Sequence, residues 1–405
     1  MKEPTVSILY RFPGERRSLL PLLTEMQKEA GFLSESAIRD ISLHLGLTDN
    51  EVYGVASYYP WFRFAPSPEA PPEPSSERSP GATSPSGGAV VVCNAARGEP
   101  GDVDRFLLAN QPAAIVQGLL REAKRLGFGR AVIWVDAEWP TAAERVTRAA
   151  GEAEKGGIVF AVVRVPGAFM HRDEAAFLKA FEGERPIGDR PPGEPRVAVY
   201  SAERLVRLAK ETRSTALYAL GGSVREPGAV QAAADVTVRQ LFERAGGIIP
   251  TGKTLKAFQA GGPLGKWLPA DRLDELAGAD SLGASTCGSG SFQFANVDAC
   301  AVDLAARSLE FLSRNLCGKC AICREGTMQM AEILCDITRG KGKAADLTLL
   351  VELGEGLATT GGCALGRAAP NALLSTMQAF RDEFDAHVRR NTCLAGRCGA
   401  GREIP

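Results

Sequence analysis

The chain has 405 residues, more than one compact hydrophobic core usually organises, so we expect two or more domains. Its 47 lysine and arginine residues nearly balance 48 aspartate and glutamate residues, and the formal net charge of −1 gives no electrostatic case for binding nucleic acid. No stretch approaches the roughly 20 apolar residues of a membrane-spanning helix, and the first residues lack the order of a secretory signal. We therefore expect a cytoplasmic location, with any membrane association made through partner subunits and no direct insertion.

Residues 1–64 predict a small helical unit. Apolar residues at helical spacing indicate a helix at 18–30, closed by Gly31, a helix at 34–46 that stops at Gly46, and a third helix start within 48–62. Residues 65–88 are rich in proline, serine, glycine and glutamate. Such a composition buries too little apolar surface to offset its ordering entropy, so it predicts a disordered linker.

The next segment, residues 89–199, alternates strand and helix patterns and therefore predicts an α/β domain with right-handed crossovers. Continuous β-branched runs are typical of buried parallel strands, and longer amphipathic runs are typical of the covering helices. The strands are expected at 89–95, 130–136 and 158–165, and the helices at 103–127 and 141–157.

The predicted secondary structure changes twice in the rest of the chain. Residues 200–295 carry short strand runs broken by glycines around one or two helices, which predicts a small mixed α+β module. Residues 296–390 are helical in pattern, with cysteines at the expected helix ends. Residues 391–405 form a tail that carries a cysteine pair.

Nine of the ten cysteines lie in the last third of the chain, and clustered cysteines in a long cytosolic protein favour metal binding over disulfides. Cys317, Cys320 and Cys323 form a C-x2-C-x2-C motif, and Cys363 follows in the glycine-rich stretch "TTGGCALG". Four thiolates of this kind are the ligands of a [4Fe–4S] cluster. A four-cysteine zinc site more often consists of two separated C-x2-C knuckles, so the cluster is favoured over zinc and over free core thiols.

Four other cysteines of this region carry separate expectations. Cys300 and Cys335 lie on apolar helical faces and are expected to be buried thiols rather than ligands. Cys393 and Cys398 have three interpretations: a second metal with His387 nearby, a disulfide, or no role.

The cysteine motif "CGKCAICREGT", the later "CALG" and the "FRDEFDAH" that ends at His387 resemble the flavoprotein (F) subunit of bacterial respiratory NADH dehydrogenase. They also resemble the related subunits of NAD-linked hydrogenases and formate dehydrogenases. The resemblance implies that Cys317, Cys320, Cys323 and Cys363 hold the cluster that takes electrons from flavin in that family. The tail "CLAGRC" is similar to the stretch that leads into a ferredoxin domain in hydrogenase-type relatives.

The resemblance extends upstream. "CNAARGEPGDVDR" and "VPGAFMHRDEAAF" resemble parts of the family's FMN- and NADH-binding domain, "ALGGSVREPGAV" resembles its β-grasp-like module, and the N-terminal helices resemble the start of the partner E subunit. The expected fold is thus a multidomain α/β and α+β chain. It combines an E-subunit-like helical unit, a Rossmann-like remnant, a β-grasp-like module and a C-terminal helical bundle that carries the iron–sulfur cluster.

Several departures from the family bear on flavin. The glycine-rich loop that lets backbone amides reach the flavin phosphate is not found before residue 89. Ala96 and Arg97 replace acidic residues, and Arg172 replaces a glycine, so a long side chain is expected in the flavin space. The remaining candidates for cofactor binding are Asn94, Gly167 and Glu174, each of which is equally interpretable as a structural relic.

The sequence therefore favours an electron-transfer subunit of an NADH-dehydrogenase-like oxidoreductase complex. It relays electrons through one [4Fe–4S] cluster, and its binding of FMN and NAD(H) is weakened or lost. The alternatives are an active subunit that passes electrons from NADH through FMN to the cluster, and a zinc-stabilised scaffold. No catalytic residue is assigned, and the expected partners are other subunits of a redox complex.

Overall fold

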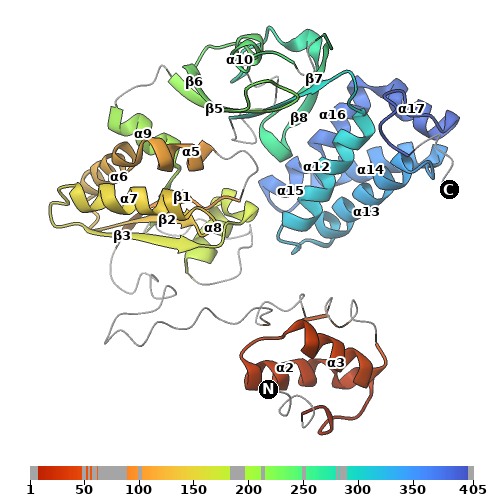
Figure 1. Ribbon diagram of the computed structural model, residues 1–405, viewed down its shortest axis with the longest axis horizontal. Coiled ribbons are helices and arrows are strands. Elements are labelled where there is room, and N and C mark those ends of the chain that lie inside the picture. The colour runs from red at the N-terminus through yellow and green to blue at the C-terminus, as the bar shows by residue number, and fades with distance from the viewer. Residues whose placement is uncertain are drawn as a thin grey trace. The chain divides into compact units, whose positions relative to one another are not determined.

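The computed structural model describes residues 8–47, 52, 55–56, 62, 89–98, 103–182, 197–210, 215–248, 252–279, 282 and 290–399 (Figure 1). The chain divides into two compact units, Met1–Ala82 and Thr83–Pro405. The predicted linker at 65–88 and most of the predicted third helix at 48–62 lie outside the described residues.

The N-terminal unit contains the two helices that the sequence predicts. They are α2 (Leu19–Ala30) and α3 (Glu35–Leu45), preceded by a 3-10 turn, η1 (Arg16–Ser18). The Ser34 hydroxyl accepts a hydrogen bond from the Ala37 amide at 3.1 Å and so caps α3. Gly31 and Gly46 end the two helices at φ values of 78° and 65°, a left-handed conformation that favours glycine. Leu22, Leu23 and Ile41 are fully buried between the helices.

The second unit begins with a four-stranded, fully parallel sheet of order β3-β2-β1-β4. Its strands are β1 (Val90–Ala95), β2 (Arg130–Asp136), β3 (Val159–Val165) and β4 (Val197–Tyr200). All six residues of the central strand β1 are buried, as its β-branched run predicts. The first three strands confirm the predictions. The sequence missed β4, because a run of four residues carries too little periodicity to stand out.

Helices cover both faces of this sheet. Alternate residues of β1 pack against α5 (Val103–Asn110), α6 (Pro112–Leu126), α7 (Pro140–Glu152) and α9 (Ala202–Lys210) on one face, and against α8 (Glu174–Phe181) on the other (Figure 1). The prediction of one helix over 103–127 is wrong. Gln111, with φ −134° and ψ 40°, breaks the helix before Pro112, because proline disfavours helical geometry in the residue that precedes it.

A second, mixed sheet of order β6-β5-β9-β7-β8 follows. Its strands are β5 (Thr215–Gly222), β6 (Gly228–Ala233), β7 (Leu255–Ala260), β8 (Lys266–Pro269) and β9 (Ser291–Asn296). β5 and β9 pair in parallel and the other neighbours are antiparallel. Helix α10 (Val238–Arg244) begins at a capping box made by Thr237 and Gln240. Phe258, Phe292 and Phe294 fill the core of this module.

The last part of the chain is helical. It consists of α12 (Ala301–Asn315), α13 (Ala321–Thr338), α14 (Ala344–Thr360), α15 (Ala364–Ala368), α16 (Asn371–Ala379) and α17 (Arg381–Arg390). Leu309, Met330, Leu350 and Phe384 are fully buried in the core that these helices share. None of the helices in the described ranges is both long and apolar enough to cross a membrane.

Candidate metal centres and flavin-binding face

Three of the four cysteines of the predicted cluster lie at the starts of two helices. Cys320 is the N-cap of α13, Cys323 lies in the first turn of that helix, and Cys363 is the N-cap of α15. Cys317 precedes Gly318, whose φ of 68° lets the chain turn between the first two thiols. Backbone N–H groups at helix starts carry partial positive charge, which favours thiolate sulfur at these positions.

Two glycines bring the loop around Cys363 against the start of α13. A Cβ atom on Gly362 would lie 2.7 Å from the Cys320 sulfur. A Cβ atom on Gly366 would lie 3.5 Å from the Cys323 sulfur and 3.7 Å from the Cys363 sulfur. The absence of side chains at these two positions therefore lets the loop around Cys363 approach the Cys320 and Cys323 sulfurs.

Ionisation of the thiols in this group is unfavourable unless a cation is nearby. Burial, together with the neighbouring thiols of Cys363, Cys317 and Cys320, raises the pKa of Cys323 to about 12. Burial also raises the pKa of Cys363, although a hydrogen bond from the Gly366 amide opposes the rise. Because thiolates are the metal-binding form, bound metal would supply the positive charge that these crowded thiols lack.

The spacing of the sulfurs distinguishes a site for a single metal ion from a site for a cluster. A zinc ion at about 2.3 Å from each sulfur places four thiolates about 3.8 Å apart. Within the described ranges, these four cysteines do not form a group of three or more ligand atoms that lie within 4.8 Å of one another. Their wider spacing fits a cluster in which each thiolate binds its own iron.

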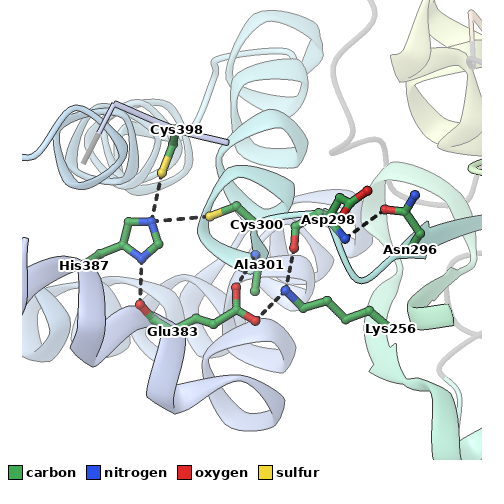
Figure 2. A network of polar contacts seen from close by, with 9 residues as sticks. Lys256, Asn296, Asp298, Cys300, Ala301, Glu383, His387 and Cys398 are labelled. Carbon is green, nitrogen blue, oxygen red and sulfur yellow. Dashed lines mark hydrogen bonds and ion pairs between the residues drawn. The ribbon is translucent and has the colours of Figure 1, made fainter. Parts of the chain in front are cut away.

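A different set of side chains does converge that closely. The ligand atoms of Cys300, His387, Cys393 and Cys398 all lie within 4.8 Å of one another, and the first three residues are buried. Figure 2 shows one nitrogen of the His387 ring facing both Cys300 and Cys398, with Nε2 3.5 Å and 2.9 Å from their sulfurs. Cys300 is buried as expected, but it is not an isolated thiol. The sequence missed this association because Cys300 and His387 are 87 residues apart.

The thiols of this second set differ in their acidity. Burial raises the pKa of Cys300. Burial also opposes ionisation of Cys393, but hydrogen bonds from the backbone and side chain of Cys398, a backbone hydrogen bond from Arg397 and the charge of His387 lower its pKa to about 6. All of these cysteines are free thiols in the structure. Ionisation is therefore easier at Cys393 than at Cys300.

The carboxyl ends of the parallel strands, where ligands bind in sheets of this class, hold a set of internal polar contacts. The Asn94 amide donates to the His171 carbonyl at 2.7 Å. The His171 ring donates from Nδ1 to the Ala96 carbonyl at 2.8 Å and makes edge contacts with Trp134 and Phe177. Of the three cofactor-binding candidates, Asn94 is thus engaged within the protein.

The other residues of this face are also engaged or exposed. A Cβ atom on Gly167 would overlap the Asp136 carboxylate at 1.9 Å, so glycine is required there by a neighbouring side chain. Glu174 begins α8 and is exposed. The Arg172 guanidinium lies 5.8 Å from the centre of the Phe169 ring.

Arg97, which stands where the family carries an acidic residue after "CNA", forms a buried ion pair. Arg97 bonds through Nε to the Asp104 carboxylate at 2.7 Å. Burial raises the pKa of Asp104, and the charge and hydrogen bonds of Arg97 hold the rise down. Arg97 therefore neutralises a buried carboxylate inside the α/β domain.

Comparison with known proteins assigns the chain to a family. Residues 303–387 match the NADH-ubiquinone oxidoreductase-F iron-sulfur binding region, and residues 76–209 match the Nuo51 FMN-binding domain. Residues 5–70 match the thioredoxin-like [2Fe-2S] ferredoxin family, although the first cysteine of this chain is Cys93. The iron–sulfur match includes Cys317, Cys320, Cys323 and Cys363.

Curated relatives agree with these matches. The chain is 31% identical to the NADP-reducing hydrogenase subunit HndC of Solidesulfovibrio fructosivorans over 76% of this chain and 71% of the relative. It is 32% identical to an F-type NADH-quinone oxidoreductase subunit of Rhizobium meliloti (strain 1021) over 75% and 81%. The chain therefore belongs to the family of flavoprotein (F) subunits of NADH-quinone oxidoreductases and related hydrogenases, with an FMN-binding domain and a [4Fe–4S]-binding region.

Among solved structures, the chain matches the crystal structure of an NAD+-reducing [NiFe]-hydrogenase in the H2-reduced state with a TM-score of 0.68. The match covers 76% of this chain and 58% of that chain, at 24% identity. At this identity the likeness shows the fold alone. It supports the multidomain architecture that the sequence predicts.

Proposed function

We propose that this chain is the iron–sulfur electron-transfer subunit of an NADH-dehydrogenase-like oxidoreductase complex, and that Cys317, Cys320, Cys323 and Cys363 hold its one [4Fe–4S] cluster. The observation that carries the proposal is the close approach of Gly362 to the Cys320 sulfur and of Gly366 to the Cys323 and Cys363 sulfurs, which brings the two cysteine segments together. When bound, the cluster accepts and passes on single electrons, and FMN exchanges hydride with NADH.

The residues around the thiols support this assignment. Cys323 is buried in the helical core, and Cys317, Cys320 and Cys363 pack against the same core at its edge. A partly exposed edge suits electron exchange with another subunit, because it limits the thickness of protein between the cluster and its partner. We expect the partners to be other subunits of a redox complex, as the names of the relatives indicate for those proteins.

The second part of the proposal is that the α/β domain binds FMN and NADH weakly or not at all. The Asn94 amide donates to the His171 carbonyl, the Asp136 carboxylate occupies the space beside Gly167, and Arg172 lies over Phe169. These residues fit a closed protein interior better than a flavin cradle. The match of residues 76–209 to an FMN-binding domain favours the alternative, an active NADH:acceptor subunit.

The test is an anaerobic preparation of the full chain, assayed for iron, acid-labile sulfide, zinc and released flavin. The relay predicts about four irons and four sulfides per chain with little flavin. Stoichiometric flavin would support the active alternative, and zinc without sulfide at these thiols would overturn both.

A pair of variants tests the ligand assignment. Cys320→Ser should abolish the low-temperature EPR signal of the reduced cluster. Cys335→Ser is the matched control, because the Cys335 thiol donates to the Glu310 carboxylate at 2.9 Å and lies outside the four-cysteine group. Equal signals from both variants would contradict the assignment.

A further inference from the structure

We propose that Cys300, His387, Cys393 and Cys398 bind one zinc ion, which fastens residues 393–398 to the start of α12 and the end of α17. This site is separate from the cluster cysteines and goes beyond the proposed electron relay. It forms a structural metal centre with three thiolate ligands and one imidazole ligand.

The geometry of the four ligand atoms matches one ion. All lie within 4.8 Å of one another, and a tetrahedron with metal–sulfur bonds of about 2.3 Å needs edges of about 3.8 Å. The His387 Nε2 atom lies 2.9 Å from the Cys398 sulfur and 3.5 Å from the Cys300 sulfur. Three thiolates and one histidine are a frequent set in closed structural zinc sites, whereas an iron–sulfur cluster needs its thiolates farther apart.

The hydrogen bond on the far side of His387 fixes the tautomer that a metal requires. Its Nδ1 atom lies 2.7 Å from the Glu383 carbonyl oxygen. Since a carbonyl oxygen only accepts, Nδ1 carries the proton and donates it. In the neutral ring, which is the form that binds a metal, the Nε2 lone pair therefore faces Cys300 and Cys398 (Figure 2). A backbone carbonyl that orients a ligating histidine in this way is the usual outer partner in zinc sites.

Glu383, in the same turn of α17 as His387, shows which elements the ion would hold together. The Glu383 carboxylate accepts from the Ala301 amide at 3.0 Å, at the start of α12, and pairs with the Lys256 ammonium of β7 at 2.5 Å. Lys256 also donates to the Ala299 carbonyl at 2.5 Å. Zinc at His387 thus reinforces a junction between β7, α12, α17 and the tail (Figure 2).

The position along α12 links this junction to the cluster. Cys300 is the N-cap of α12, and that helix ends at Asn315, two residues before Cys317. A fixed start of α12 therefore holds the helix that leads into the cluster-binding loop. The two metal centres occupy opposite ends of one helix without sharing a ligand.

The experiment measures zinc and iron together in the anaerobically purified full chain. Wild type should contain about one zinc per chain besides the cluster iron. Cys398→Ser should lose that zinc and keep the iron, sulfide and cluster EPR signal, whereas Cys335→Ser should keep both metals. Cluster failure in the wild type with zinc retained would count against the proposed relay and leave this site standing.

A spectroscopic measurement on the wild type keeps the test independent of variant folding. Replacing the zinc with Co²⁺ should give the thiolate-to-cobalt charge-transfer band and the intense visible bands of a tetrahedral site. Absence of zinc and of a cobalt spectrum would overturn the proposal, as would a mass matching a Cys393–Cys398 disulfide in protein prepared without oxidant. Retention of zinc in Cys398→Ser would also overturn it.

Discussion

Gly362 faces the Cys320 thiol so closely that a Cβ atom would lie 2.7 Å from the sulfur. We predict that Gly362→Ala lowers the iron and sulfide content per chain severalfold, because the methyl group displaces a ligand sulfur. Gly356→Ala is the matched control. Gly356 lies within α14 with nothing within 4 Å of a Cβ atom, so this change should retain the cluster and stabilise the helix by about 0.5–1 kcal/mol. Equal cluster content in both variants would argue against ligation by Cys320.

The sequence could predict this centre because its four cysteines carry local signals. Three of them follow one another at steps of three, and the fourth lies among glycines that a close approach requires. The three long strands were predictable for the same reason, since each β-branched run lies whole within one element. The position of Cys300 was not predictable. Its neighbours His387 and Cys398 come from distant segments, and only the packing of α12 against α17 brings them together.

The buried histidine of the α/β domain predicts an acid-sensitive stability. Burial of His171 lowers its pKa, although its bond to Ala96 and the charge of Asp136 oppose the shift. The unfolded histidine titrates near pH 6.5. Below that pH the unfolded state gains a proton that the folded state accepts only at lower pH, so stability falls as pH falls. Above that pH both states are neutral, and no penalty exists.

We therefore expect His171→Gln to flatten the dependence of the urea midpoint on pH between about 6.5 and 5. Tryptophan fluorescence, to which Trp134 beside His171 contributes, reports unfolding. His44→Gln, in the N-terminal unit, controls for the loss of a histidine. An unchanged slope in His171→Gln would show that other groups cause the acid sensitivity.

The ion pair between Lys256 and Glu383 predicts that a conservative substitution of Glu383 strongly lowers the free energy of unfolding. Both side chains are nearly buried, at 13% and 11% exposure. Glu383→Gln keeps an acceptor for the Ala301 amide but leaves the Lys256 ammonium without its carboxylate. We expect a loss of about 3 kcal/mol in the free energy of unfolding, measured by urea titration. Adding Lys256→Met should recover part of the loss, because both charges are then removed, and failure to recover would contradict an electrostatic cause.

The side chain of Arg172 predicts a partial recovery of flavin binding. Its guanidinium lies over Phe169. The family has a glycine at the position of Arg172. Arg172→Gly, combined with a glycine-rich loop grafted ahead of Ala89, frees this space and supplies backbone donors for the flavin phosphate. We expect FMN to bind at least about tenfold more tightly than to wild type, which corresponds to about 1.4 kcal/mol. Arg172→Lys with the same loop keeps a long side chain and should gain little. FMN fluorescence quenching measures both affinities, and equal gains would mean that the loop alone limits binding.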